Sequence, residues 1–308
     1  MNNIFDTIII GAGPGGLTAG IYTARRQMKT LIITRQIGGQ VVWASEIMNY
    51  PGYQTIQGIK LIKQMQEQIK ALKIEILIDE ILKIKKNNNY SFTLVTDKHQ
   101  SFFTKTIIIA IGLAPKKLNL PGETEFTGKG ISYCANCDTP LFKNKIVAVA
   151  GGGNAALDAA EISAKIASQV YLIYRGDKLR GFEELAKQIR KQKKIKIFYQ
   201  TEIKEILGSS KLEKIIIFNK QTNQTAQLTI DGLFIEIGRA PETAWLAKLV
   251  KLDENKQIIV DQVGQTSQAG IFAVGDVTQN KFKQIIISCG QGATAALAAY
   301  QHLQLQKM

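Results

Sequence analysis

An α/β protein with two related halves, the second inserted in the first, is the fold that this sequence predicts. Two glycine-rich turns, Gly11–Gly16 and Gly151–Ala156, each follow an apolar, β-branched stretch and precede a helical one. Each half then closes on almost the same phrase, IAIGLAP at Ile109–Pro115 and IEIGRAP at Ile235–Pro241. A strand, a glycine turn, a helix and a second strand, occurring twice, are typical of Rossmann-like three-layer domains.

The first half begins with a buried strand at Phe5–Ile10, which is apolar apart from one charge. After the glycine turn, Leu17–Arg25 has a helical pattern and Thr30–Thr34 is the next expected strand. Alternating, β-rich sequence at Ile74–Thr96 precedes the closing phrase. Residues 1–114 therefore form the first segment of one domain in this prediction.

The second half repeats this order. Ile146–Ala150 is expected to be a strand, Leu157–Ile166 a helix and Val170–Tyr174 a strand. β-rich sequence follows at Ile195–Leu228. Residues 115–241 form the inserted domain in this prediction.

The chain continues beyond the second half. It contains the stretch Gly270–Val277 and an alanine-rich helix from Gly290 to about His302. We expect residues 242–308 to return to the first domain, which is then discontinuous in sequence.

Composition narrows the class of protein. The 308 residues are 45% hydrophobic and 21% charged, which is ordinary for a globular chain of about two domains. No apolar run approaches the roughly 18 residues that a membrane helix needs, and the first residues lack the pattern of a signal peptide. Three cysteines do not make a disulfide framework, which indicates a cytoplasmic location.

The chain is strongly basic, with a net charge of +14. Its lysines lie in short scattered groups such as Arg190–Lys194, without the interleaved aromatic residues of a nucleic-acid surface. This pattern disfavours nucleic-acid binding. A positive field would instead steer anionic cofactors or an acidic protein partner.

The glycine turns predict two dinucleotide sites. A pyrophosphate needs backbone N–H groups that point at it and no side chain in the way. Gly11 would make the tight turn, Gly13 would permit close approach, and Gly16 would let the helix pack on the strand. The second turn offers the same positions as Gly151, Gly153 and Ala156. One such motif is weak, but two copies, each between a strand and a helix, are strong.

The end of the second strand in each unit selects the nucleotide. In the second half, Arg175 and Arg180 favour the 2′-phosphate of NADP, while Asp177 keeps NAD as an alternative. In the first half the strand ends at Thr34-Arg35-Gln36, without the acid that would bind a ribose. A dinucleotide bound there must have its ribose held by other groups.

Cys134 and Cys137 form a C-x-x-C motif with three interpretations. A zinc site would need further ligands. The remaining cysteine and the histidines, which form no second pair, are Cys289, His99 and His302. Two inert buried cysteines are the second interpretation. A redox dithiol fits best, because the spacing lets the sulfurs bond, a helix start favours the thiolate, and Asp138 is within reach as a proton donor or acceptor.

A dithiol and a nicotinamide need an intermediary to exchange electrons. A flavin accepts hydride and also forms thiol adducts, so it joins the two chemistries. Two dinucleotide sites and a C-x-x-C motif therefore predict FAD in one site and a nicotinamide cofactor in the other.

The sequence resembles the low-molecular-weight bacterial thioredoxin reductases over essentially its full length. The segments that carry the resemblance are Gly11–Gly16, Gly38–Gln40, Asn49–Gly52, Cys134–Asp138, Gly151–Asn154 and Gly275–Val277. The family implies a homodimer in which electrons pass from NADPH through FAD to the Cys134–Cys137 disulfide and then to thioredoxin. It also implies FAD binding by residues 1–114 and 242–308, and NADP binding by residues 115–241, which carry the disulfide.

The resemblance implies binding residues by position. For FAD they are Gly11, Gly13, Pro14, Gly16, Gly38, Gly39, Gln40, Asn49, Ala110, Gly112, Gly275, Asp276, Gln284 and Ile285. For NADP they are Gly151, Gly152, Gly153, Asn154, Ala155, Arg175, Arg180, Ile237 and Gly238. Asp276 would hold the ribitol chain, and Gln284-Ile285 would face the isoalloxazine ring. NADH remains an alternative to NADPH, and no metal is expected.

Three positions depart from the family pattern. Ala135-Asn136 stands where the family often has Ala-Thr. Tyr174-Arg175-Gly176 keeps only one of two adjacent arginines that usually grip NADPH. The acid expected near Arg35 is missing.

The order of the domains has a mechanical consequence. The thiols and the nicotinamide belong to one domain, and both need the flavin. The resemblance therefore suggests that the insert rotates between two states about linkers near Leu113–Lys117 and Arg239–Glu242.

Two other functions fit parts of the pattern. One is a related flavin reductase that passes electrons to ferredoxin or to a peroxidase partner. The C-x-x-C motif disfavours ferredoxin, and peroxidase-linked enzymes normally carry an extra N-terminal domain, whereas the strand here begins at Phe5. The other is a dinucleotide-binding redox sensor with little turnover, against which the nearly complete catalytic set argues.

Overall fold

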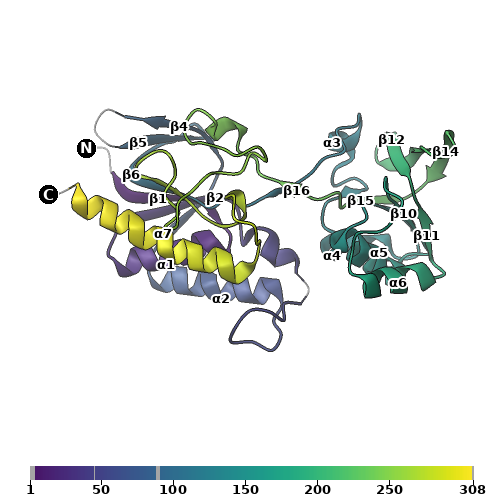
Figure 1. The fold of residues 1–308 in the computed structure, drawn as a ribbon, viewed down its shortest axis with the longest axis horizontal. Helices are drawn as coiled ribbons and strands as arrows, with labels where there is room; N and C mark the ends of the chain where they lie inside the picture. The colour runs from purple at the N-terminus through teal and green to yellow at the C-terminus, as the bar shows by residue number, and fades with distance from the viewer. Residues whose placement is uncertain (1–3, 45, 88–90, 307–308) are drawn as a thin grey trace. The chain divides into compact units, whose positions relative to one another are not determined.

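The computed structural model describes residues 4–44, 46–87 and 91–306, and they form two compact units. Unit 1 contains the described residues up to Ala114 and those from Pro241 onward, and unit 2 is Pro115–Ala240 (Figure 1). The chain passes between the units twice, at β7 (Ala114–Pro115) and β16 (Arg239–Ala240), and these two crossings pair as a two-stranded sheet.

The sheet of unit 1 has seven strands in the order β3-β2-β1-β6-β5-β4, with β17 beside β6. The strands are β1 (Phe5–Ala12), β2 (Thr30–Ile37), β3 (Glu75–Ile78), β4 (Ile81–Lys86), β5 (Phe92–Thr96), β6 (Ser101–Ile109) and β17 (Ile271–Ala273). β1, β2, β3, β6 and β17 pair in parallel, whereas β4 and β5 form an antiparallel ribbon on β6. The central strands are buried on both faces, which explains apolar runs such as Ile8–Ile10.

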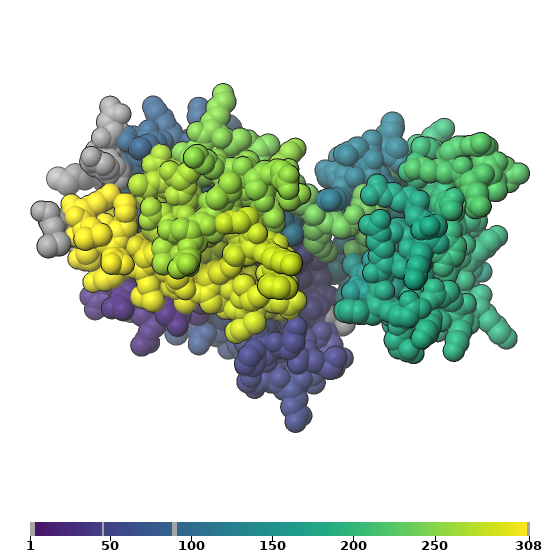
Figure 2. Space-filling view, viewed as in Figure 1, coloured from purple at the N-terminus to yellow at the C-terminus, as the bar shows by residue number. Residues whose placement is uncertain are grey.

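Two further layers cover this sheet. The helices α1 (Pro14–Arg25), α2 (Gly58–Ala71) and α7 (Ile285–Leu305) lie together on one face (Figure 1). β4, β5 and the chain that follows Pro241 bury a second cluster on the other face. Short 3₁₀ segments complete the unit: η1 (Gly39–Trp43), η3 (Ala244–Leu246) and η4 (Gly275–Val277). Figure 2 shows α7, in yellow, along the surface of this unit.

Unit 2 is built on a parallel five-stranded sheet in the order β11-β10-β9-β15-β8. The strands of this sheet are β8 (Ile131–Ser132), β9 (Ile146–Ala150), β10 (Gln169–Ile173), β11 (Ile195–Phe198) and β15 (Gly232–Ile235). A three-stranded antiparallel sheet packs on one face: β12 (Thr201–Gly208), β13 (Leu212–Asn219) and β14 (Gln224–Thr229). The remaining segments are α3 (Glu123–Phe126), α4 (Ala135–Asp138), η2 (Thr139–Phe142), α5 (Asn154–Ile166) and α6 (Glu183–Lys191), and the cluster on the opposite face draws on α5 and α6.

The predicted fold class is confirmed, because each unit has three layers around a sheet with parallel strands. The sequence analysis did not identify α2 or α6. In α2 the signal was present, since Leu61, Ile62, Met65 and Ile69 recur at helical spacing and are buried. The last helix is longer than expected: it begins at Ile285, whereas the sequence predicted a start at Gly290. None of the helices formed by the described residues has the length and apolar character that crossing a bilayer requires.

Candidate active site

The first glycine turn joins β1 to α1 at the carboxyl ends of the parallel strands. Gly11 has a φ of +103°, and a Cβ on Gly11 would collide with the carbonyl of Ala110. A Cβ on Gly16 would collide with the carbonyl of Gly11, so helix and strand approach closely. The Cβ position of Gly13 is open, and no described side chain caps the first turn of α1. Open space beside these N–H groups fits a phosphate.

Segments far apart in sequence surround this turn. The Gly38 N–H donates to the Ala12 carbonyl at 2.7 Å, which places η1 beside the turn. The Asn49 amide donates to the Gln284 side-chain oxygen at 3.0 Å, which joins a loop of unit 1 to the start of α7. The Gln40 amide donates to the Leu113 carbonyl.

The start of α7 packs on the start of α1. The would-be Cβ of Gly15 lies 3.1 Å from the Ser288 carbonyl oxygen, so a side chain there would crowd α7. The Gly275 N–H, in η4, donates to the side-chain oxygen of Gln291 at 2.8 Å. Asp276 follows Gly275 in η4. Burial lowers the pKa of Lys283, and the negative charge of Asp276 partly opposes this shift. The residues predicted for FAD thus come from β1, α1, η1, the loop that carries Asn49, the segment after β6, η4 and the start of α7, all in unit 1.

Arg35 lies where the sequence lacks the expected acid, near the end of β2. Its guanidinium forms ion pairs with Glu80 and, at 2.9 Å, with Glu242. The hydrogen bond with Glu80 raises the pKa of Arg35 most, although partial burial opposes it. Neither carboxylate was predicted from the sequence, because no local pattern links Glu80 or Glu242 to β2.

The second glycine turn repeats the geometry of the first in unit 2. Gly151 has a φ of +144°, and a Cβ on it would collide with the carbonyl of Glu236. Gly153 begins α5, its Cβ position is open, and no described side chain caps that helix. Ala156 replaces the third glycine and is fully buried beside Gly151.

The loop after β10 folds back over this turn. The Arg180 N–H donates to the Gly152 carbonyl at 2.7 Å, and the Phe182 N–H donates to the Asn154 side-chain oxygen at 2.7 Å. Arg175 and Arg180 are exposed, and neither forms an ion pair with a described residue. Arginines without an ion-pair partner among the described residues, in a loop whose backbone contacts the second glycine turn, suit a further phosphate.

Cys134 and Cys137 form a disulfide, with their Cα atoms 5.4 Å apart. Cys134 precedes α4, and its Sγ accepts a hydrogen bond from the Cys137 N–H at 3.2 Å. The Ser132 hydroxyl accepts from the Cys134 N–H at 3.0 Å, which fixes the backbone before the pair. Cys137 is exposed, and Asp138, the last residue of α4, is partly buried.

The whole chain was compared with known proteins. A family model described as pyridine nucleotide-disulphide oxidoreductase matches residues 5–292. The chain belongs to the pyridine nucleotide-disulphide oxidoreductase family. The predicted similarity to bacterial thioredoxin reductases is confirmed.

Three similar proteins illustrate this oxidoreductase family. The thioredoxin reductase of Treponema pallidum (strain Nichols) is 35% identical over 98% of each chain. A crystal structure of Lactococcus lactis thioredoxin reductase, in the FR conformation, is 38% identical with a TM-score of 0.88 and covers 98% of this chain and 99% of its own. A protein named NADH dehydrogenase from Bacillus subtilis (strain 168) is 35% identical over 97% of this chain. The chain spans only 58% of the length of that last relative.

Two carboxylates in this member of the oxidoreductase family, one buried and one partly buried, were not predicted from the sequence. Glu123 is only 2% exposed. Its carboxylate accepts the N–H groups of Leu118 and Asn119 at 2.9 and 2.6 Å, and the Tyr133 hydroxyl at 2.7 Å. Tyr133 is the residue before Cys134. Burial raises the pKa of Tyr133 most, and the hydrogen bond and negative charge of Glu123 raise it further. Glu123 therefore anchors the start of unit 2 to the segment that carries the disulfide.

Glu236 is the second such residue and follows β15. Burial raises the pKa of its carboxyl group to about 7, and the charge of Arg239 and a hydrogen bond from the Ala135 N–H only partly offset this. In the sequence, Glu236 lies between Ile235 and Ile237 at the end of an apolar strand. Nothing in this local pattern indicates that Ala135 affects its pKa.

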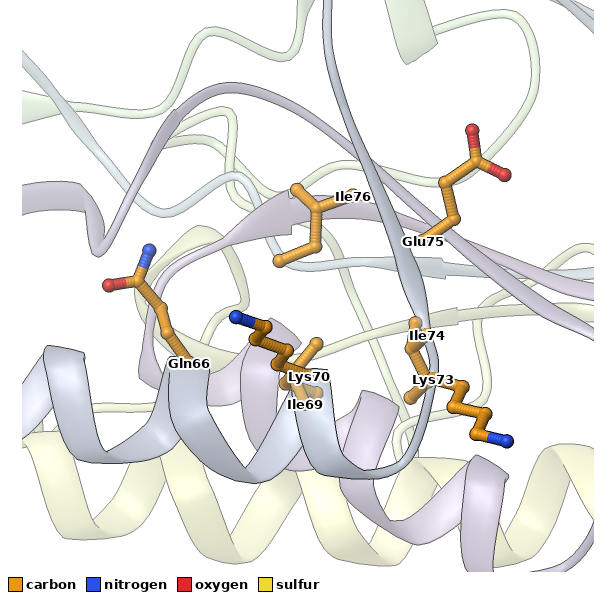
Figure 3. A pocket seen from close by; sticks show the side chains of 7 residues that line it. All are labelled: Gln66, Ile69, Lys70, Lys73, Ile74, Glu75 and Ile76. Atoms are coloured by element: carbon orange, nitrogen blue, oxygen red, sulfur yellow. The ribbon is translucent and has the colours of Figure 1, made fainter.

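Two further features involve residues that were not predicted for either cofactor site. A hollow between the end of α2 and β3 is lined by Gln66, Ile69, Lys70, Lys73, Ile74, Glu75 and Ile76 (Figure 3) and contains none of the predicted site residues. Cys289 is buried in α7, where the Tyr50 hydroxyl reaches its Sγ at 3.8 Å. Within the described ranges, no group of three histidines, cysteines or acids is placed to hold a metal ion.

Proposed function

We propose that the chain is a flavoprotein disulfide reductase that passes electrons from NADPH through FAD to the Cys134–Cys137 disulfide and then to a thioredoxin-like protein. The observation that carries this proposal is a disulfide of C-x-x-C spacing in a chain with two open glycine cradles. The similarity to thioredoxin reductases along 98% of both chains supports the choice of acceptor.

Unit 1 would hold FAD. The turn at Gly11, Gly13 and Gly16, with α1 behind it, has the shape and the N–H groups that a pyrophosphate requires. The side chains of Asn49 and Gln284, which are hydrogen-bonded to each other, would orient the isoalloxazine end of FAD. When bound, the flavin would supply the step between hydride and sulfur chemistry.

Unit 2 would hold the nicotinamide cofactor. Gly151 and Gly153 would receive the pyrophosphate, and Arg175 and Arg180 would hold a 2′-phosphate, which supports NADPH over NADH. Asp177, also exposed in this loop, is the feature that would favour NADH.

The reduced Cys134 and Cys137 would then carry out thiol–disulfide exchange with the partner protein. Once the disulfide is reduced, a thiolate attacks the disulfide of the partner and forms a mixed disulfide. The second cysteine attacks that bond, so the partner leaves reduced and Cys134–Cys137 forms again. Asp138, adjacent to Cys137, would give a proton to the departing thiolate. We propose that the enzyme acts as a cytoplasmic homodimer, as its resemblance to the bacterial thioredoxin reductases implies.

The decisive experiment is an anaerobic titration of the purified full-length protein with NADPH and with NADH, before and after Cys137→Ser. We expect a yellow protein whose flavin is bleached by NADPH in both forms, and turnover with thioredoxin only in the unsubstituted form. A colourless protein that does not take up FAD would overturn the proposal. A bleached flavin without thioredoxin-dependent turnover would identify a reductase with another acceptor or a sensor.

A further inference from the structure

Glu123 is a buried carboxylate that the proposed electron transfer does not use. Among the described residues, no lysine, arginine or histidine forms an ion pair with it. N–H and O–H groups meet its charge instead, and the backbone donors are Leu118, Asn119 and, at 3.4 Å, Leu120. Burying a carboxylate is unfavourable unless such bonds are made, so the donors and the carboxylate hold one another in place.

One donor to Glu123 comes from the segment that carries the disulfide. The Tyr133 hydroxyl donates to the same oxygen, Oε1, as the Leu118 N–H, at 2.7 Å. The ring of Tyr133 is partly buried and packs on the apolar cluster between the two sheets of unit 2. Packing therefore fixes the ring of Tyr133, and Glu123 fixes its hydroxyl.

Tyr133 connects the sheet to Cys134. Ser132, the residue before it, pairs with Phe234 of β15. The Ser132 hydroxyl accepts from the Cys134 N–H at 3.0 Å and lies 3.2 Å from the Cys134 carbonyl oxygen, to which it donates. The position of Cys134 thus depends on the short segment that Tyr133 anchors.

Cys137 is held by a different set of contacts. It lies in α4, where the Thr139 hydroxyl donates to the Ala135 carbonyl at 2.7 Å. Thr139 and Ala135 are both buried, and Ala135 belongs to the cluster that α5 and α6 cover. The two sulfurs are therefore positioned from opposite sides, Cys134 from β8 and Cys137 from the packed turn of α4.

The anchor of Tyr133 matters most when the disulfide is open. In the oxidised protein the covalent bond holds the pair, with the Cα atoms of Cys134 and Cys137 5.4 Å apart. After reduction only noncovalent contacts keep the sulfurs close. A segment that is already fixed loses less conformational entropy when the bond forms again than a mobile segment does.

We propose that Glu123 is a positioning residue that, through the Tyr133 hydroxyl, holds the reduced Cys134 within reach of Cys137 and so favours closure of the disulfide. In closure the two thiols lose two protons and two electrons, and the disulfide of the oxidant takes both as it becomes two thiols. Without the anchor, the effective concentration of one thiol at the other falls. The inference rests on the proposed function only in requiring that the disulfide be reducible.

The test is the thiol–disulfide equilibrium of the full-length protein with glutathione. Protein and Tyr133→Phe are equilibrated without oxygen in mixtures of reduced and oxidised glutathione and trapped with N-ethylmaleimide. Mass spectrometry then measures how much of the peptide that carries Cys134 and Cys137 is alkylated. In Tyr133→Phe we expect the equilibrium constant for disulfide formation to fall about threefold to tenfold, since one hydrogen bond is lost. An unchanged constant overturns the proposal.

A matched control is Tyr171→Phe. The ring of Tyr171 packs on the same apolar cluster, and its hydroxyl forms no hydrogen bond with a described residue. Its equilibrium constant should match that of the unsubstituted protein, and a fall as large as in Tyr133→Phe would refute the role of Glu123. Because glutathione replaces NADPH and thioredoxin, the result does not depend on the proposed electron path.

Glu123→Gln provides a second variant that acts on the same hydrogen bond. An amide has one accepting oxygen where the carboxylate has two, so the equilibrium constant should fall here as well. Because both substitutions remove one interaction, the fall in the double variant should be smaller than the product of the two single falls. A fall equal to that product means that Glu123 does not act through Tyr133, and the proposal fails.

Hydrogen exchange separates positioning from a general loosening of unit 2. In reduced Tyr133→Phe, the backbone N–H groups of residues 133–138 should exchange at least about threefold faster than in the reduced unsubstituted protein. Those of residues 118–120 should not change, because Glu123 still accepts them. Unchanged exchange at 133–138, or an equal increase at 118–120, contradicts the proposal.

Discussion

Single glycines in the first turn serve two different purposes. Gly16 has no space for a Cβ, because the Gly11 carbonyl occupies it. Gly13 has an ordinary φ of −72° and open space at its Cβ position. Folding alone explains Gly16, whereas the vacant space beside Gly13 leaves room for a ligand at the start of α1.

This difference predicts opposite effects for the same substitution. Gly16→Ala should cost about 1–3 kcal/mol of unfolding free energy, because backbone must move. Gly13→Ala should change the stability of the flavin-free protein by no more than about 0.5 kcal/mol, yet weaken FAD binding. Denaturant unfolding of flavin-free protein and fluorescence titration with FAD measure the two effects. Equal FAD affinity in Gly13→Ala and the unsubstituted protein would contradict the placement of the phosphate.

The two exposed arginines after β10 predict the choice of nucleotide. Arg175→Gln and Arg180→Gln should each raise the KM for NADPH about tenfold, since a charge-assisted hydrogen bond to phosphate is lost. The KM for NADH should stay within about twofold. Arg190→Gln, which removes an arginine already paired with Glu183, is the matched control. Steady-state kinetics with both nucleotides measure these KM values. An equal rise in the KM for NADPH and for NADH would argue against a 2′-phosphate site.

Burial of Glu236 also predicts how stability depends on pH. The folded pKa of about 7 lies above the ordinary value of 4.5, so the folded state binds more protons between these values. Stability from this group is therefore full below about pH 4.5 and falls as pH rises toward 7. Relative to Glu236→Gln, the unsubstituted protein should lose on the order of 1–3 kcal/mol between pH 5 and pH 8. Denaturant unfolding at both values measures this, and a constant difference would show that Glu236 stays ionised.

At the scale of elements, the contact of α1 with α7 brings two distant parts of unit 1 together. A Cβ on Gly292 of α7 would collide with the carbonyl of Gly15 and lie 3.2 Å from the Ala19 N–H. The two helices therefore approach at backbone distance. Since α7 also carries Gln284 and Ile285 at its start, this contact sets where those residues stand relative to the first glycine turn.

Two glycines of α7 test this packing. Gly292→Ala should destabilise unit 1 by about 1–3 kcal/mol, because α7 must move away from α1. Gly290→Ala, on the same helix with nothing near its Cβ position, should instead stabilise by about 0.5–1 kcal/mol through helix propensity. Thermal unfolding monitored by circular dichroism compares them. If both variants shift the midpoint in the same direction, close packing is not what Gly292 provides.

At the scale of the molecule, the two crossings between the units are short. The Lys116 N–H donates to the Gly238 carbonyl at 2.9 Å, and β7 pairs with β16. Gly112 and Gly238, which flank the crossings, have φ values of +64° and +101°. Because only these two segments connect the units, the rotation of unit 2 that the resemblance suggests would require changes at only a few backbone angles.

Rotation of unit 2 predicts that a crosslink between the units abolishes turnover. Cysteines introduced one in each unit would be joined by a bismaleimide while Cys134 and Cys137 are protected as the disulfide. The locked protein should keep its flavin but lose NADPH-dependent reduction of thioredoxin, because the nicotinamide and the disulfide both need the flavin. Each single-cysteine variant treated with the reagent is the control. Full turnover in the locked protein would refute the motion.

The sequence by itself predicted the two halves, the parallel strands and both glycine turns, and it favoured a bond between Cys134 and Cys137 over a zinc site or two inert thiols. Each of these depends on residues close together in the chain, through buried strand runs, turn chemistry or a two-residue spacing. Only the tertiary structure decided which carboxylates serve the sites. Arg35 meets Glu242 across 207 residues and Glu80 across 45. Such partners are chosen by packing, and burial, which no local pattern records, then sets their charge.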